Sequence, residues 1–316
     1  MTTEPAATGP RCRGCGAAGA RLRGTKHSAF LGRDFEYWDC AACGMMFVEP
    51  FAGYQVYDDA YYQGRGADPY VDYETEYRDY RSTDRIEELR DLWRVASGFV
   101  GRSLEPGPVE WLDFGCGAGG LLQFLSAQRE IRSGDRSWPL RLSGHDIGTY
   151  ADRLRRDGFE ILSLDALHSQ PDGRYDVISL IEVIEHIEYP DEVFRLVARL
   201  LKPGGLLLLT TGNVASPAFR VQGLGYGYCM PEVHVSYFTP RALGVAYARH
   251  GLVPVCFRYD GTVRFKVIKT LRTPGRQRLA RRALRFPPVV WMIDFLFGTS
   301  RMPCATKPRA ARVART

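Results

Sequence analysis

The feature that most constrains the fold is a regular alternation, from Val109 onward, of short apolar strand patterns with helical patterns. The predicted strands cover 109–114, 140–146, 159–163, 174–180, 204–211, 253–259 and 302–307. The predicted helices lie near 119–129, 149–157, 190–201 and 240–250. Because strands that are joined through helices run parallel and are covered on both faces, the pattern predicts an α/β domain whose ligands bind at the carboxyl ends of its strands.

The first predicted strand ends in a glycine-rich turn that spans residues 113–120. Gly115, Gly117 and Gly120 satisfy the G-x-G-x-x-G spacing, so a dinucleotide cofactor such as NAD is one interpretation. A carboxylate at Asp113 would repel a pyrophosphate, but it could receive the ammonium group of an amino acid. This position therefore favours a cofactor that contains an amino-acid moiety.

Two further carboxylates follow the next two predicted strands. Asp146 ends the second strand, where it could accept both hydroxyls of a ribose, a feature that dinucleotide-binding folds share. Asp165 follows the third strand, where it could accept the exocyclic amine of an adenine. The three carboxylates would match the ammonium, the ribose hydroxyls and the adenine amine of an adenosyl amino acid. This match favours S-adenosylmethionine over NAD.

Several stretches of this domain resemble the motifs of class I methyltransferases. Trp111 to Gly119 is similar to their first motif, and Tyr175 to Ser179, Glu182 to His186 and Leu201 to Gly205 are similar to later ones. The resemblance covers about 109–260 and looks closest to the ubiquinone-biosynthesis O-methyltransferase-like branch. It implies a Rossmann-like, seven-stranded sheet whose last strand is antiparallel.

The same resemblance implies which residues hold the cofactor. Asp113 and the glycine turn would hold the methionine moiety, Asp146 the ribose and Asp165 the adenine. The full implied S-adenosylmethionine site is Asp113, Gly115, Cys116, Gly117, Gly119, Asp146, Ile147, Asp165, Ala166 and Glu182.

Candidate acceptor-side residues follow the fourth predicted strand. Glu182, Glu185 and His186 lie at i, i+3 and i+4, so on a helix they would share one face at the carboxyl edge of the sheet. His234 lies downstream, and two carboxylates with two imidazoles could hold Mg²⁺ or another divalent cation with open positions. The arrangement is similar to metal-dependent 2′-O-methyltransferases of small-RNA termini and to quinone-pathway O-methyltransferases.

Three interpretations of this cluster stay open. A divalent cation there would bind adjacent hydroxyls of the acceptor and lower the pKa of one of them. Without a cation, His186 or His234 would act as the general base. In a purely structural role, both glutamates would bond backbone amides and the histidines would be packing or surface groups.

Two aromatic segments flank the predicted site. In the connector 49–108, eight of the chain's 17 tyrosines fall between Tyr54 and Tyr80. Its helical pattern predicts either a packed cap or a lid over the active site, with Tyr77 as a candidate substrate contact. The loop 212–233 is rich in glycine and aromatic residues, and it is either an ordinary loop or a clamp on the substrate. Its candidate substrate contacts are Phe219, Tyr226 and Tyr228.

The N-terminal residues 1–48 contain two Cys-x-x-Cys-Gly sequences. Twenty-four residues separate the pair Cys12 and Cys15 from the pair Cys40 and Cys43. Each turn would place two thiolates on one metal, with glycine accepting a positive φ, so the four cysteines predict a zinc ribbon with a closed structural zinc site. A rubredoxin-like iron site and unliganded thiols are the alternatives.

The charge of the chain is unevenly distributed. The formal net charge is +6, yet residues 271–316 hold 11 Arg or Lys and one acid, whereas the other 270 residues hold 31 bases and 35 acids. The basic residues fall in two predicted segments. One is a basic helical insertion at 264–300 within the predicted methyltransferase region 109–310, and the other is a disordered basic tail at 308–316. A basic amphipathic helix can contact anionic lipid, RNA or a phosphorylated substrate, or it can face water.

Three functions are therefore considered. The first is O-methylation of a hydroxyl on a small molecule such as a sugar, a phenol or a specialised metabolite in natural product biosynthesis, with N- or C-methylation as a variant. The second is RNA methylation, in which the ribbon and the basic helix bind the RNA backbone. The third is a non-catalytic scaffold. No apolar run approaches the roughly 20 residues of a bilayer span, and no secretory signal is recognisable, so a cytoplasmic location is expected.

Overall fold

The computed structural model describes residues 9–68, 72–83, 85–258 and 301–308, together with the isolated residues 283, 288 and 289. The predicted helical insertion 264–300, apart from those three positions, and the predicted tail beyond residue 308 lie outside the described residues. Over the described part of the chain, no helix has the length and apolar composition needed to cross a bilayer.

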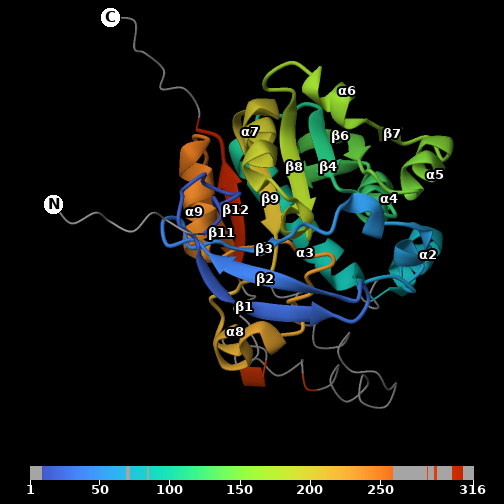
Figure 1. Ribbon diagram of the computed structural model, residues 1–316. Helices are drawn as coiled ribbons and strands as arrows, with labels where there is room; N and C mark the ends of the chain where they lie inside the picture. The colour runs from blue at the N-terminus through green and yellow to red at the C-terminus, as the bar shows by residue number, and fades with distance from the viewer. Residues whose placement is uncertain are drawn as a thin grey trace, which may run out of the picture.

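A mixed sheet forms the centre of the molecule (Figure 1). Its strands are β4 (Val109–Phe114), β5 (Glu130–Ser133), β6 (Arg136–His145), β7 (Glu160–Ile161), β8 (Tyr175–Ile181), β9 (Leu201–Thr210), β11 (Val253–Arg258) and β12 (Arg301–Thr306). They follow the order β11-β12-β9-β8-β4-β6-β5, with β7 beside β6. Strands β7, β6, β4, β8 and β9 run parallel, and β12 lies antiparallel between β9 and β11. All seven predicted strands and the antiparallel last strand are confirmed.

The sequence prediction missed strand β5. It pairs antiparallel with the first half of β6 through a turn at Gly134, which adopts a positive φ of 58°. Ile131 and Trp138 face the core, whereas Arg132 and Ser133 are exposed. This alternation around a Gly-Asp turn is a hairpin signal that the prediction did not use.

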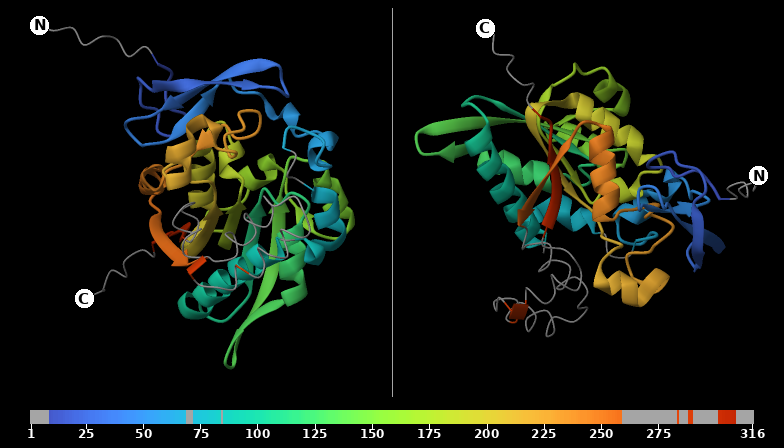
Figure 2. Two further views of the ribbon diagram at one scale, coloured as in Figure 1. Left: turned by 90° about the horizontal axis from the view of Figure 1, so that it is seen from below. Right: turned by 90° about the vertical axis from the view of Figure 1, so that its left-hand side faces the viewer.

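Helices cover both faces of the sheet (Figure 2). One face carries α3 (Ile86–Ser103), α4 (Gly120–Gln128) and α5 (Tyr150–Arg156), and the other carries α6 (Leu164–His168), α7 (Pro190–Leu200) and α9 (Pro240–Arg249). Helix α7 shows why such segments are helical. Pro190 opens it, two acids follow in its first turn, and Phe194, Val197 and Leu200 are buried against the sheet.

The N-terminal ribbon forms a second sheet, and this sheet includes a strand of the α/β domain. Strands β1 (Arg21–Ser28), β2 (Arg33–Asp39) and β3 (Met46–Glu49) are antiparallel, and β3 then pairs with β10 (Ser236–Tyr237). Figure 1 shows this sheet lying across one end of the central sheet. The ribbon is therefore joined to the α/β domain by backbone hydrogen bonds.

The connector is a series of short helices between the ribbon and α3. It contains η1 (Tyr54–Val56), α1 (Asp59–Tyr62), α2 (Tyr73–Asp79) and η2 (Tyr80–Ser82). Tyr61 and Tyr62 are buried in a cluster with ribbon residues such as Phe35 and Tyr37. Beyond β9, the loop to β10 contains α8 (Pro217–Gln222) and η4 (Gly223–Gly225).

Candidate functional site

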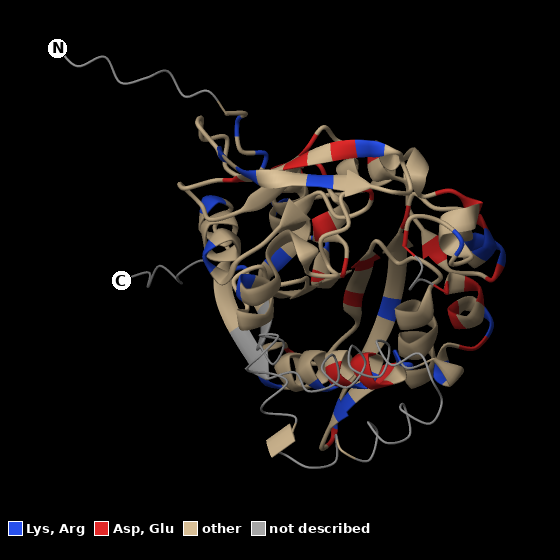
Figure 3. Ribbon diagram, turned by 60° about the horizontal axis from the view of Figure 1, so that its bottom comes forward, with Lys and Arg blue, Asp and Glu red and all other residues tan. Residues whose placement is uncertain are grey.

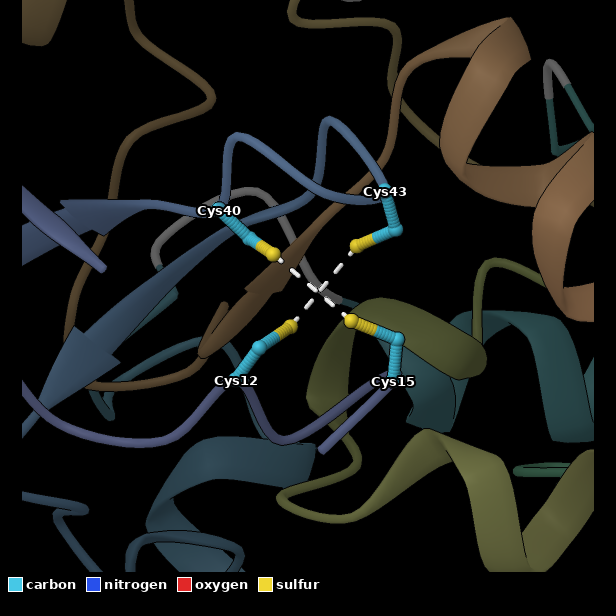
Figure 4. Close-up of side chains that lie close together, drawn as sticks. All are labelled: Cys12, Cys15, Cys40 and Cys43. Atoms are coloured by element: carbon cyan, nitrogen blue, oxygen red, sulfur yellow. Dashed lines mark hydrogen bonds between the residues drawn. The ribbon is translucent and has the colours of Figure 1, made fainter. Parts of the chain in front are cut away.

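The two cysteine pairs form matching turns at one end of the ribbon. The Gly16 N–H donates to the Cys12 carbonyl and the Gly44 N–H donates to the Cys40 carbonyl, both at 2.8 Å. Gly16 and Gly44 have φ values of 76° and 85°, a region that favours glycine. As a result, the four sulfur atoms point toward one centre (Figure 4).

The spacing of these sulfur atoms suits a tetrahedral metal ion. The Sγ atoms of Cys12 and Cys43 lie 3.7 Å apart, and those of Cys15 and Cys40 lie 3.6 Å apart. A tetrahedron with Zn–S bonds of about 2.3 Å places its sulfurs about 3.8 Å apart. The four thiols therefore fit zinc, and rubredoxin-type iron would need the same ligands. All four positions come from the protein, so the site has a structural rather than a catalytic geometry.

The glycine turn connects β4 to α4 and bends sharply where it packs against the connector. Gly115, Gly117 and Gly119 all have positive φ values, of 78°, 52° and 80°. A Cβ atom at Gly117 would lie 2.8 Å from the ring of Tyr73. The tyrosine therefore packs directly on the turn, and only glycine fits at this position.

Asp113 ends β4 and is buried, with 3% of its surface exposed. The Ser179 hydroxyl donates to its Oδ1 at 2.7 Å. Burial raises the pKa of Asp113 to about 7, against the opposing effects of the Ser179 hydrogen bond and the charge of Arg85. Because the ionised carboxylate is poorly solvated here, a cationic partner such as an ammonium group would stabilise it strongly.

Asp146 follows β6 and links that strand to the glycine turn. The Gly117 N–H donates to its Oδ2 at 2.8 Å, and the Gly148 N–H donates to its Oδ1 at 2.7 Å. The Tyr62 hydroxyl also donates to Oδ1, at 3.5 Å. These bonds hold the carboxylate at the carboxyl edge of the sheet. Its contact with a ribose stays a prediction.

A cavity of about 130 Å³ lies beside the glycine turn. The ends of β4, β6 and β8 form one side of it, and the connector forms the other. The connector tyrosines that line it are Tyr54, Tyr57, Tyr61, Tyr62 and Tyr73. The connector therefore lies over the cavity, which is the lid arrangement that the sequence left as one of two interpretations.

Most of the charged residues in the cavity lining are acidic. Among the described residues that line it are the carboxylates of Glu76, Asp113, Asp146 and Glu182 and the guanidinium of Arg85. Arg85 Nη1 lies 3.1 Å from Glu76 Oε2, which fixes its position. Elsewhere, acidic and basic residues are interspersed over the described elements (Figure 3). The lining therefore suits a ligand with cationic groups and one anionic group.

A second cluster adjoins the cavity. The turn η3 (Ile184–His186) follows β8 and brings Glu185 and His186 to His234, so that one ligand atom of each lies within 4.8 Å of the others. Glu185 is fully buried, and the Thr211 hydroxyl donates to its Oε2 at 2.9 Å. His186 also lines the cavity. The two parts of the site therefore meet at His186.

Backbone carbonyls set the tautomers of both histidines. His234 Nδ1 lies 2.7 Å from the Tyr228 carbonyl, and His186 Nδ1 lies 3.0 Å from the Val233 carbonyl. A carbonyl only accepts, so each Nδ1 carries the proton and each Nε2 keeps its lone pair. Burial also lowers the pKa of His186, which favours the neutral ring. Both rings can therefore bind a cation or accept a proton through Nε2.

Glu182 lies apart from this three-residue cluster. A 3₁₀ turn over 184–186 replaces the helix considered for 182–186, and Glu182 adopts a φ of 55° directly after β8. The three side chains therefore do not share a helical face. Glu182 instead lines the cavity between the glycine turn and His186.

The remaining predicted cofactor residues have different placements. Gly115 and Cys116 line the cavity, and Ile147 lines it with a side chain that is 64% exposed. Asp165 lies in the exposed first turn of α6, and the Ala166 N–H donates to the hydroxyl of Ser163, which caps that turn. Neither Asp165 nor Ala166 is among the described residues that line the cavity.

The four predicted substrate contacts also lie away from the cavity lining. The Tyr77 hydroxyl donates to Asp157 Oδ2 at 2.7 Å, and Phe219 is buried in the cluster beneath the ribbon. Tyr226 packs on Phe219. Tyr228 stacks on His234, with ring centroids 4.3 Å apart, so it touches the second cluster.

Sequence reasoning missed Tyr57, Arg85 and the other connector residues of the lining. The Tyr57 hydroxyl lies 2.9 Å from His186 Nδ1 and donates to the Val233 carbonyl at 2.9 Å. The density of tyrosines was the available signal, but the helical spacing selected Tyr77 instead. Which tyrosine faces the cavity depends on how the short helices pack.

The chain also matches known proteins in sequence. A family model described as "Methyltransferase domain" matches residues 76–256. The ubiquinone biosynthesis O-methyltransferase of Xanthomonas axonopodis pv. citri is 32% identical over 165 residues, which are 46% of this chain and 66% of that protein. The enzyme of the same name from Methylococcus capsulatus is 29% identical over 150 residues, which are 44% and 61%. The chain thus spans less than two thirds of the length of these relatives.

Solved structures also align with parts of the chain. Geranyl diphosphate C-methyltransferase from Streptomyces coelicolor aligns over 70% of this chain and 82% of its own, with 17% identity and a TM-score of 0.43. A SAM-dependent methyltransferase from Archaeoglobus fulgidus aligns over 70% and 94%, with 16% identity and a TM-score of 0.44.

Proposed function

Because the chain belongs to the S-adenosylmethionine-dependent methyltransferase family, we propose that its cavity binds this cofactor and methylates a hydroxyl of a small molecule. The observation that carries the proposal is that one cavity joins the glycine turn after β4 to His186 of the Glu/His cluster. A cofactor on the turn would then meet an acceptor at the cluster. A sugar, a phenol or a specialised metabolite is the acceptor class we propose.

The charges of the lining support the orientation of the cofactor. Its ammonium group would pair with Asp113, and its carboxylate would face Arg85, the guanidinium at the same side of the cavity. Asp146 would accept the ribose hydroxyls. The adenine would lie along the exposed face of Ile147 toward Asp165 and Ala166, and Glu182 would lie near the sulfonium.

The acceptor side would be bounded by the connector. Tyr54 and Tyr57 line the cavity near His186, together with Val183 and Ile187. Aromatic rings of this kind can stack on a phenol or on the apolar face of a sugar. We therefore propose Tyr54 and Tyr57 as substrate contacts in place of Tyr77, Phe219, Tyr226 and Tyr228.

Glu185, His186 and His234 have the donor set for a divalent cation. One buried carboxylate and two imidazoles with Nε2 lone pairs suit Mn²⁺, Mg²⁺ or Zn²⁺, and other positions would stay open for the acceptor. A bound cation would lower the pKa of an acceptor hydroxyl. In a cation-free reaction, His186 Nε2 would take the hydroxyl proton, and the carbonyl of Val233 would keep Nδ1 protonated.

We keep the proposed ribbon at 1–48, connector lid at 49–108 and methyltransferase region at 109–310, with one change. Helix α3 packs on the central sheet, so we assign it to the methyltransferase region. The expected cytoplasmic location stays a prediction. The RNA alternative rests on the ribbon and on the basic segment at 264–300, and most of that segment lies outside the described residues. The small-molecule function is favoured because the described cavity is acidic and bounded by tyrosines.

A labelled-methyl screen tests the function. The full chain is incubated with S-adenosyl[methyl-³H]methionine and either metabolite extract or total RNA, with EDTA followed by Mg²⁺ or Mn²⁺ in parallel. Label in a small-molecule fraction supports the proposal, whereas label confined to RNA contradicts it. The His234→Ala variant tests the cluster, because unchanged turnover both with this variant and with EDTA would exclude a role for the cation.

A further inference from the structure

We infer that the four-cysteine ribbon positions the acceptor side of the active site, because it holds the segment carrying His234 against the turn carrying Glu185. The inference rests on the proposed function, which assigns these residues to acceptor activation. It gives the ribbon a task in this enzyme beyond being a stable small module.

The first contact is a continuous backbone ladder. Ser236 and Tyr237 of β10 pair with Phe47 and Met46 of ribbon strand β3. The Val48 N–H of the ribbon donates to the Val235 carbonyl at 3.0 Å. The Val235 N–H in turn donates to the Glu185 carbonyl at 2.8 Å. The residue after His234 is therefore bonded to the ribbon on one side and to the Glu185 turn on the other.

The second contact fastens the loop that orients His234. The Ser28 hydroxyl donates to the Glu232 carboxylate, and the Lys26 ammonium donates to the Cys229 carbonyl. Ser28 and Glu232 are 1% and 9% exposed, so this polar contact is shielded from water. Next to Cys229 lies Tyr228, whose carbonyl accepts the proton of His234 Nδ1. Strand β1 therefore fixes the group that sets the tautomer of His234.

The third contact ties the cysteine turns themselves to α9. Arg241 donates to the Ala42 carbonyl at 2.8 Å, and the Thr239 hydroxyl donates to the Gly44 carbonyl at 3.1 Å. Both carbonyls belong to the second Cys-x-x-Cys-Gly turn, and shared ligation of a zinc ion by the thiols would stabilise the shape of that turn. Loss of that shape would release β3 from its place beside β10.

The cofactor side is held by a different set of contacts. Asp113 is bonded by Ser179, and Asp146 is bonded by Gly117 and Gly148, all within the central sheet and its loops. The connector adds one longer bond, from the Tyr62 hydroxyl to Asp146 Oδ1 at 3.5 Å. Disturbing the ribbon should therefore separate the two halves of the site. The acceptor half would lose order, while the cofactor half would keep its affinity.

The test uses three variants of the full chain. Cys40→Ser/Cys43→Ser removes one pair of thiols, and Ser28→Ala keeps all four thiols but removes the contact with Glu232. Asp34→Asn is the matched control, since it alters an exposed contact with His27 between β1 and β2, neither of which pairs with β10. Zinc content, amide hydrogen exchange over 228–238, ¹⁵N signals of the histidine rings and S-adenosylhomocysteine affinity by calorimetry are measured for each.

We expect the cysteine variant to lose zinc and to lower amide protection at Val235 by about tenfold or more. The His234 ring should show mixed tautomers, and S-adenosylhomocysteine affinity should stay within about twofold of the wild-type value. Ser28→Ala should retain zinc with a smaller change of the same kind, and Asp34→Asn should match the wild type.

Two results would overturn the inference. One is unchanged protection at Val235 and an unchanged His234 ring while the ribbon amides exchange freely. The other is equal loss of cofactor affinity in the cysteine variant, which would mean general unfolding. If the wild-type chain itself does not bind S-adenosylhomocysteine, the proposed function fails. The exchange and ring signals would still decide whether the ribbon positions His234.

Discussion

The pKa of Asp113 makes cofactor binding depend on pH in a calculable way. Burial raises that pKa to about 7, and only the ionised carboxylate can pair with the ammonium group of the cofactor. Binding therefore weakens by the factor 1 + 10^(pKa − pH) as the pH falls below 7. Between pH 7 and pH 5 this factor rises from about 2 to about 100, a loss of roughly 50-fold or about 2.3 kcal/mol.

The assay is isothermal titration of S-adenosylhomocysteine between pH 5 and 7, a window in which an α-amino group stays largely protonated. Circular dichroism at each pH checks that the protein remains folded. Asp113→Asn is the control, since its amide cannot titrate but can still accept from Ser179. We expect this variant to bind weakly and almost independently of pH. A wild-type affinity that does not change over the window would refute the pairing of Asp113 with the ammonium group.

Three further predictions follow from single contacts. Tyr57→Phe should lower the free energy of unfolding by about 1 kcal/mol and shift the pH profile of methyl transfer, because His186 Nδ1 loses a neighbouring hydroxyl. The control variant Tyr61→Phe should leave the pH profile unchanged. Gly117→Ala should weaken S-adenosylhomocysteine binding more than Gly134→Ala. Both glycines have positive φ, but only Gly117 faces the Tyr73 ring. Equal affinities of the two variants for S-adenosylhomocysteine would contradict the prediction. Glu185→Gln should lower Mn²⁺ affinity by about tenfold or more relative to the control Glu192→Gln, a change at an exposed position. The affinity is measured by electron paramagnetic resonance, and equal affinities of the two variants would argue for a cation-free site.

Local patterns predicted the secondary structure of the central domain well. The seven strands and the helices between them follow from apolar periodicity, because both faces of a parallel sheet must be buried. The prediction failed where contacts are not periodic. The helix considered for 182–186 is a short turn, because Glu182 leaves β8 with a positive φ that a helix does not allow.

The cofactor side was predictable for a related reason. Asp113 is the next-to-last residue of β4 and Asp146 directly follows β6, so their positions follow from the carboxyl edge of a parallel sheet. The acceptor side was predictable only in part. The sequence pointed to Glu185, His186 and His234 but not to Tyr57, which lies 177 residues from His234 in the chain. Helical spacing alone selected Tyr77, which lies against Asp157 instead.

By itself, the sequence determined the α/β sheet, the glycine turn with its carboxylates and the four-thiol turns, because each depends on residues close together in the chain. Only the tertiary structure decided which tyrosines line the cavity and that Glu185, His186 and His234 meet without Glu182. It alone also joined the ribbon to the active site through β3 and β10. These features need strands and loops distant in sequence to pack together, and no local spacing encodes the geometry of that packing.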